Sequence, residues 1–157
     1  MTNFQRHSAY ARFERVIDAD PGCVSRTREE LGWWLQSQFD LDSVRLNDMV
    51  LAVYEALANS AEFAYLSAAV PGTITMQGAY DPARSSLTLS VADQGRWLEA
   101  DHGGPLETNR ARGRGLALMR VLADRANIDT SAYGTTVRLQ FDNVRVAASL
   151  NHAQLSR

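Results

Sequence analysis

The architecture of this chain follows most directly from residues 54–61, Tyr54-Glu55-Ala56-Leu57-Ala58-Asn59-Ser60-Ala61. They lie in a segment whose apolar periodicity predicts a long helix from about Val44 to Leu66. Residues four apart on a helix share a face, so Glu55 and Asn59 are expected to point the same way. An acid that can orient a hydroxyl, beside an amide oxygen that can hold a hard cation, suits phosphoryl transfer. Taken alone, the pair is equally well explained as a solvated helix face. A separate stripe is expected to pack inward and consists of Val50, Val53, Tyr54, Leu57, Ala61 and Ala64.

A strand and a helix are predicted before this segment. Residues 9–19 alternate imperfectly between apolar and polar side chains and predict a strand, and Asp20-Pro21-Gly22 is typical of a turn. Helical spacing over residues 24–39 predicts the first helix, with Ser25 as its N-cap. The apolar positions of this helix are Val24, Leu31, Trp34, Leu35 and Phe39.

Two neighbouring strands are predicted after the long helix. Residues 73–80 and 87–93 both alternate, and residues 81–85 form a hairpin-like connection between them. Residues 94–112 are rich in glycine, proline and charge and are expected to form a long loop, and such loops are usually functional or mobile.

The C-terminal part is predicted as a helix over residues 115–126, a strand over residues 135–141, and a weak helix or frayed tail over residues 142–157. One face of the helix is expected to carry Leu116, Met119, Leu122 and Ala123. The order of elements lacks the regular alternation of a doubly wound parallel sheet. It favours an α+β fold, a two-layer sandwich in which helices cover one face of a mainly antiparallel, mixed sheet.

Composition and charge exclude several classes of function. The chain has 157 residues, about the size of one domain, and its net charge of -2 comes from mixed charges without a basic tract, so direct nucleic-acid binding is not expected. Its apolar runs are too short for a membrane span, and its N-terminus lacks the apolar core of a secretory signal. Cys23 is the only cysteine, which fits a reducing cytoplasm. The three histidines, His7, His102 and His152, lack metal-ligand spacing.

Three further motifs follow the acid–amide pair. Asp93-Gln94-Gly95 stands where a strand ends, Gly113-Arg114-Gly115 opens the predicted third helix, and Gly134-Thr135-Thr136 begins the last strand. In this order and spacing, the series resembles the GHKL superfamily of ATPases, which includes gyrase and the catalytic domains of histidine kinases. Within it, the chain most resembles the anti-sigma factor serine kinases of bacteria. The resemblance runs from about Val24 to Phe141 and implies a histidine-kinase-like ATPase fold, with residues 1–142 as a single domain and residues 143–157 as a C-terminal tail.

The resemblance implies roles for the matching residues. Asn59 falls on the Mg²⁺-binding position, where one amide oxygen is enough because Mg²⁺ keeps several waters and takes other ligands from phosphates. Glu55 falls on the catalytic position, where it would orient or deprotonate a serine hydroxyl or an attacking water. Asp93 falls on the adenine-reading position, where a carboxylate accepts a hydrogen bond from the exocyclic amine of adenine. Gly95 would let the backbone approach the base. An ordinary turn closing a strand explains Asp93 and Gly95 as well.

The glycine-flanked arginine and the two threonines complete the implied nucleotide site. Gly113 and Gly115 would form a flexible loop that presents helix N–H groups to phosphates, with Arg114 adding positive charge. The alternative is a glycine hinge with a solvated arginine. Thr135 and Thr136 fall on the threonine position near the base, although threonine is common in any strand.

The chain departs from the family pattern at two positions. Trp97 replaces the last glycine of the usual Asp-x-Gly-x-Gly motif, and it is expected to anchor the loop on the core. Phe63 replaces a frequent histidine and is expected in the core. These changes leave ATP affinity and catalytic strength open.

The resemblance thus implies an ATP- and Mg²⁺-binding serine/threonine kinase, and we expect it in the cytoplasm. The resemblance implies that it binds a sigma factor, phosphorylates an anti-sigma-factor antagonist and forms a homodimer. The first helix would then supply part of the partner surface, with Arg26, Arg28 and an exposed tryptophan of the Trp33-Trp34 pair as candidate contacts. Arg26 and Arg28 are equally well explained as solvated charges on a helix face. The alternatives are a nucleotide-binding interaction module without kinase activity and a regulatory protein that has lost its nucleotide.

Overall fold

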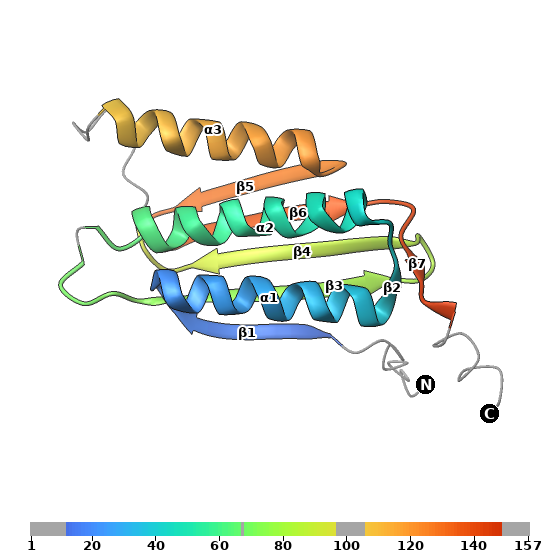
Figure 1. The fold of residues 1–157 in the computed structure, drawn as a ribbon. Coiled ribbons are helices and arrows are strands. Elements are labelled where there is room, and N and C mark those ends of the chain that lie inside the picture. Colours follow the sequence, from blue (N-terminus) through green and yellow to red (C-terminus); the bar gives the residue numbers. More distant parts are fainter. Residues whose placement is uncertain (1–11, 67, 97–105, 149–157) are drawn as a thin grey trace, which may run out of the picture.

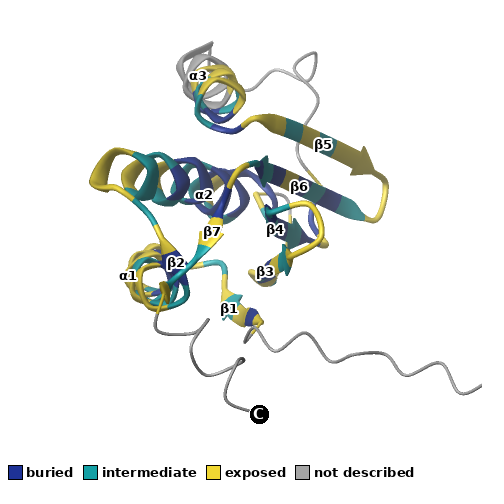
Figure 2. Ribbon diagram, turned by 90° about the vertical axis from the view of Figure 1, so that its right-hand side faces the viewer, coloured by how far each residue is buried: buried dark blue, intermediate teal, exposed yellow. Residues whose placement is uncertain are grey.

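The computed structural model describes residues 12–66, 68–96 and 106–148, without the side chains of residues 106–112. It is a two-layer α+β sandwich in which α1, α2 and α3 cover one face of a sheet (Figure 1), and Figure 2 shows the two layers end-on. The predicted fold class is therefore confirmed. The elements run in the order β1 (Phe13–Asp18), α1 (Pro21–Gln38), β2 (Phe39–Asp40), α2 (Ser43–Phe63), β3 (Thr73–Asp81), β4 (Ser86–Asp93), α3 (Leu106–Leu122), β5 (Arg125–Ser131), β6 (Gly134–Phe141) and β7 (Arg145–Val146).

The main sheet has five strands in the order β1-β3-β4-β6-β5. Every pair of neighbouring strands in it is antiparallel, so within the described residues the sheet is wholly antiparallel rather than mixed. The predicted hairpin at residues 81–85 is confirmed, because β3 and β4 pair directly across it. Of the strand predicted at residues 9–19, residues 9–11 lie outside the described part.

The helix α1 begins at Pro21, and the predicted turn and the predicted N-cap at Ser25 are both wrong. Asp20 has an extended backbone and caps the helix, since its side chain accepts a hydrogen bond from the Cys23 N–H at 3.1 Å. Pro21 occupies the first turn, where a missing N–H costs no helical hydrogen bond. The Asp-Pro-Gly sequence is therefore a helix start that resembles a turn signal.

The helix α2 is the central helix, with α1 on one side and α3 on the other. The predicted inward stripe is partly wrong, because Val50, Tyr54 and Ala61 are only partly buried. Because α2 contacts α1, α3 and the sheet, a wider part of its surface is buried than a single apolar stripe would cover. The buried positions of α2 are Met49, Ala52, Val53, Ala56, Leu57, Asn59, Ser60 and Phe63.

The C-terminal half differs most from the prediction. The helix α3 begins at Leu106, inside the segment predicted as a loop, and ends at Leu122 rather than near Ala126. Met119 and Ala123 are buried as expected. The strand β5 was missed, because at the edge of the sheet it buries only part of Ala126 and Ile128 and carries mostly exposed polar residues.

Residues beyond the expected domain boundary contribute to the packed structure. Val144 is 1% exposed and belongs to the hydrophobic core, and β7 pairs with β2. Trp34 packs on the core with Phe13 and Phe39, whereas Trp33 is 68% exposed, as predicted for this pair. Among the residues that the structure describes, no helix has the length and apolarity of a membrane span.

Candidate functional site

Three elements bring the predicted motifs to one end of the sandwich. Asp93 is the last residue of β4, and the pairing of β4 with β6 places Thr135 directly opposite it. The C-terminal half of α2 lies over this end of the sheet, since its Ser60 hydrogen-bonds Asp93. Asp93 and Thr135 both face the helix layer, because both are buried at alternating positions of their strands.

The carboxylate of Asp93 is buried and held through both oxygens. Its Oδ2 accepts a hydrogen bond from the Ser60 hydroxyl at 2.7 Å, and its Oδ1 accepts one from the Gly95 N–H at 3.1 Å. Asp93 is 6% exposed and Ser60 is 1% exposed. The strand end, the helix and the turn therefore fix the position of one acceptor group.

Two glycines allow the backbone to close around Asp93. A Cβ at Gly95 would lie 2.0 Å from the Ala64 carbonyl oxygen, at the end of α2. A Cβ at Gly134, whose φ is +152°, would lie 2.0 Å from the Asp93 carbonyl oxygen. No side chain fits in either place. Contact with the end of α2 alone requires glycine at position 95, and the approach of Gly95 to a base stays a prediction.

Tyr65 holds the turn after Asp93 from the other side. Its hydroxyl donates to the Thr73 carbonyl at 2.6 Å and accepts from the Gln94 N–H at 3.1 Å. Sequence reasoning assigned no role to Tyr65 or to Ser60. Their contacts with residues 93–94 span about thirty positions, and no local pattern indicates such pairings.

Glu55 and Asn59 share a face of α2, as predicted, and that face meets α3 at Gly115. A Cβ at Gly115 would lie 3.0 Å from Glu55 Oε2 and 3.2 Å from Asn59 Nδ2. Glu55 is partly buried, and Asn59 is only 5% exposed. The absence of a side chain at Gly115 therefore leaves room for the acid and the amide where the two helices meet.

Two polar atoms of this site are buried without a hydrogen-bond partner among the described residues. They are Nδ2 of Asn59 and the hydroxyl oxygen of Thr135. A buried unsatisfied polar group costs about 1–3 kcal/mol. Thr135 pairs with Asp93 across the sheet, and Asn59 precedes Ser60, which hydrogen-bonds Asp93. The amide nitrogen of Asn59 can donate a hydrogen bond, and the Thr135 hydroxyl can donate or accept one, so both atoms fit a polar ligand.

Not all predicted site residues join this cluster. Thr136 occupies the alternate position of β6, opposite Ala92, and so lies on the face of the sheet away from the helices. Gly113 and Gly115 lie inside α3 rather than at its start, so the prediction that they open the helix is wrong. Arg114 lies between them and is exposed. Trp97 lies outside the described residues.

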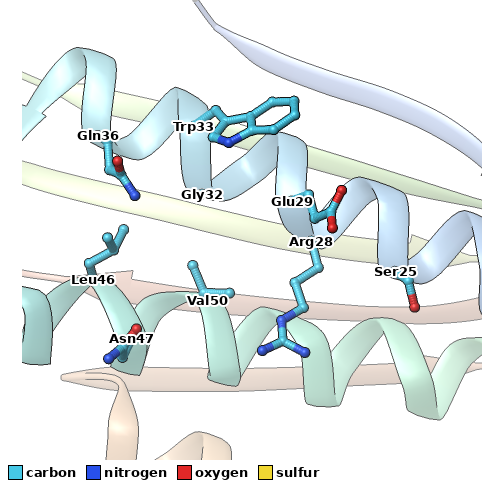
Figure 3. Close-up of a pocket in the computed structure, with 9 residues that line it drawn as sticks. All are labelled: Ser25, Arg28, Glu29, Gly32, Trp33, Gln36, Leu46, Asn47 and Val50. Carbon is cyan, nitrogen blue, oxygen red and sulfur yellow. The ribbon is translucent and has the colours of Figure 1, made fainter.

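Two grooves run between α1 and α2, and neither is lined by Asn59, Asp93 or Thr135. The larger one has a volume of about 670 Å³ and is shown in Figure 3, where Arg28 extends from α1 toward α2. Its guanidinium lies 5.0 Å from the ring centroid of Tyr54. The second, of about 300 Å³, lies farther along the same two helices. The larger groove is lined by Ser25, Arg28, Glu29, Gly32, Trp33, Gln36, Leu46, Asn47 and Val50.

The fold and the clustered motifs define a class of protein. Residues 17–141 match the family model of the histidine kinase-like ATPase domain, and the chain belongs to this family. Membership implies nucleotide binding, which fits the donor set around Asp93.

Solved structures with the same fold include proteins of two kinds. The chain is similar to the crystal structure of the RsbU and RsbW domains of Rv1364c from Mycobacterium tuberculosis, with a TM-score of 0.66 and 25% identity over 86% of this chain. It spans 33% of that chain. It also shares its fold with the histidine kinase domain of the blue-light activated histidine kinase of Erythrobacter litoralis EL346, with a TM-score of 0.53 and 18% identity over 77% of this chain and 59% of the other.

Proposed function

We propose that this chain binds ATP with Mg²⁺ and transfers the γ-phosphoryl group to a Ser or Thr of an anti-sigma-factor antagonist. One observation carries the proposal, namely that Nδ2 of Asn59 on α2 and the hydroxyl of Thr135 on β6 are buried without a partner among the described residues, while the neighbouring Ser60 hydrogen-bonds Asp93. The likeness to a chain with an RsbW domain, together with the motif series, supports the anti-sigma type.

In the proposed reaction, the hydroxyl oxygen of the substrate protein bonds to the γ-phosphorus while the bond from that phosphorus to the bridging oxygen breaks and ADP leaves. Glu55 orients the hydroxyl and accepts its proton. Mg²⁺ held by the amide oxygen of Asn59 would neutralise charge on the phosphates. Asp93 accepts a hydrogen bond from the adenine amine, and Thr135 bonds the base or a water beside it. Arg114, exposed on α3, supplies positive charge toward the phosphates.

We place the partner surface on the outer side of α1 and α2, where the larger groove lies. Trp33 is 68% exposed at its rim, and Arg28 crosses it (Figure 3). Arg26 is exposed on the same helix. A large aromatic side chain beside arginines suits an apolar contact ringed by acidic groups on a sigma factor. We expect the active form to be a homodimer in the cytoplasm, where ATP is available.

The test is phosphoryl transfer from radiolabelled ATP to a cognate antagonist. A Glu55→Gln variant should transfer about 10²–10⁴ times more slowly than wild type, because the amide accepts no proton, while its affinity for ATP is kept. Glu62→Gln, an exposed acid seven positions on along α2, is the matched control and should transfer normally. A Glu55→Gln variant as active as wild type would exclude Glu55 as the base.

A nucleotide-binding interaction module without transfer is the second candidate. It is favoured by Phe63, which is 3% exposed and fills with an aromatic ring the position where relatives often carry histidine. Wild-type protein that binds ATP and the antagonist, yet leaves the antagonist unlabelled, would support this candidate instead.

A further inference from the structure

Ser60 follows Asn59 on α2 and is the side chain through which the helix reaches the carboxylate of Asp93. Its hydroxyl lies 2.7 Å from Asp93 Oδ2, and both residues are buried. An ionised carboxylate only accepts hydrogen bonds, so the serine must be the donor. Hydrogen bonds to a charged acceptor at such a distance belong to the strong class.

The helix itself gives no reason for a serine at this position. Alanine has the higher helix propensity, and the neighbours Ala56, Ala61 and Ala64 are all small. A serine within a helix often turns its hydroxyl back to the carbonyl four residues earlier. Ser60 instead donates to a residue 33 positions away in the sequence. The contact with Asp93 therefore accounts for the hydroxyl.

Hydrogen bonds from Ser60 and from the Gly95 N–H reach the two oxygens of Asp93 and help to fix the plane of its carboxylate. The Gly95 N–H holds Oδ1 from the turn, and Ser60 holds Oδ2 from the helix. Without Ser60, Oδ2 would lose the donor on the helix, and rotation of the carboxylate about its last side-chain bond, which has a broad torsional preference, would be less restricted. The direction in which it accepts hydrogen bonds would then be less well defined.

We infer that Ser60 is a positioning residue that sets the selectivity of the nucleotide site for a purine with an amine at position 6. This inference rests on the proposed ATP site. A carboxylate held in one orientation accepts a hydrogen bond from the 6-amine of adenine. Guanine carries a carbonyl oxygen at the same position, and this oxygen would be repelled because both groups are acceptors. A hydrogen bond gives strong selectivity between two ligands only where the protein acceptor stays aligned with the donor of the preferred ligand.

The experiment is a thermodynamic cycle that combines one change in the protein with one change in the ligand. Calorimetry in the presence of Mg²⁺ measures the binding affinities. Wild type and Ser60→Ala are titrated with ATP, with GTP and with purine riboside triphosphate, which lacks the 6-amine. Ser60→Ala should lower the affinity for ATP about tenfold and that for purine riboside triphosphate less than about twofold, so the ratio of the two affinities falls. The preference for ATP over GTP should fall with it.

Ser86→Ala is the matched control. Ser86 is also buried and lies near an aspartate, with its hydroxyl 3.5 Å from Asp142 Oδ1, but it begins the strand that Asp93 ends. This variant should leave all three affinities unchanged. If Ser60→Ala does not fold, as judged by circular dichroism, Ser60→Cys keeps the volume, loses most of the donor strength and should show the same loss.

The outcomes separate this inference from the proposed function. Wild type that binds ATP, with a Ser60→Ala variant that weakens ATP and purine riboside triphosphate equally or not at all, overturns the role of Ser60 and leaves the ATP site standing. Wild type that binds no nucleotide overturns both.

Discussion

At the scale of single residues, the candidate site contains buried polar atoms that lower the stability of the fold. Asn59 and Thr135 each bury a polar atom that no described residue hydrogen-bonds. Such positions are typical of functional sites, where stability and activity are in conflict. Substitutions there should separate the two properties.

Thr135→Val tests this separation. Valine has nearly the shape of threonine and removes the unpartnered hydroxyl, so the free energy of unfolding should rise by about 1 kcal/mol while ATP affinity falls. Thr136→Val on the opposite face of β6 is the control and should change ATP affinity little. Urea denaturation and calorimetry measure the two quantities. If both variants lost the same affinity for ATP, the interpretation that Thr135 but not Thr136 belongs to the site would be contradicted.

The sequence predicted the polar residues of this site better than their partners. Glu55, Asn59 and Asp93 belong to motifs whose spacing is visible along the chain. Ser60 and Tyr65 reach Asp93 and Gln94 only after α2 lies on the sheet. Thr135 and Thr136 are equivalent in the sequence, and only the register of β6 against β4 distinguishes them.

At the scale of elements, α3 carries an internal conflict. Gly113 and Gly115 lie within it, although glycine inside a helix costs about 1 kcal/mol relative to alanine. Gly115 has a packing reason, because a side chain there would meet Glu55 and Asn59. For Gly113, no packing reason is found in the described part of the chain, where a Cβ would meet nothing within 4 Å. We propose that Gly113 allows this part of α3 to leave the helical conformation if the phosphates of the proposed nucleotide bind there.

Gly113→Ala should therefore raise the free energy of unfolding by about 0.5–1 kcal/mol and weaken ATP binding, because the helix becomes harder to open. Gly32→Ala is the matched control: Gly32 lies in α1, and a Cβ there also meets nothing within 4 Å. It should stabilise the protein similarly and leave ATP binding unchanged. An unaltered ATP affinity in Gly113→Ala would contradict the opening of α3.

Elements with a strong local pattern were predicted, and those shaped by their neighbours were not. The alternation of β3 and β4 and the apolar positions of α2 indicated the sandwich. The start of α1 was missed because Asp-Pro-Gly is shared by turns and helix caps, and only the Asp20–Cys23 hydrogen bond distinguishes them. The edge strand β5 was missed because an edge position needs few apolar residues.

At the scale of the whole molecule, a second polar cluster closes the end of the sandwich opposite to the site. The Arg45 guanidinium of α2 pairs with Asp124 at 2.7 Å and also donates to the Asp142 carbonyl, while the Asp142 N–H donates to Asp124. The cluster joins α2 to the start of β5 and the end of β6. Partial burial acts to raise the pKa of Asp124, but the hydrogen bonds from the Asp142 N–H and Arg45 outweigh it and hold this pKa below its usual range.

Asp124→Asn should lower the free energy of unfolding at neutral pH by at most about 1 kcal/mol, because the pair is partly exposed. A carboxylate whose pKa is lower in the folded state stabilises the fold above its unfolded pKa of about 3.9, and this contribution is lost as the pH falls through the folded value. The difference between wild type and variant should thus be present at pH 7 and vanish at strongly acidic pH.

Urea denaturation across this range measures the effect. The control is Asp129→Asn. Asp129 pairs with Arg138, and its side chain is more exposed than that of Asp124, so this variant should lower the free energy of unfolding less. Because the Asp124 cluster lies at the far end of β4 from Asp93, Asp124→Asn should also leave ATP affinity unchanged. If the difference in the free energy of unfolding between wild type and Asp124→Asn grew as the pH fell, the predicted direction of the pH dependence would be contradicted.

The most direct test of the central claim is a calorimetric titration of wild type and Asn59→Ala with ATP in Mg²⁺, with the exposed Asn47→Ala of the same helix as control. The account predicts saturable binding at one site per chain in wild type and Asn47→Ala, and affinity at least about tenfold lower in Asn59→Ala, the loss typical of a disturbed metal site. Wild type without saturable binding, or Asn59→Ala with unchanged affinity, would contradict it.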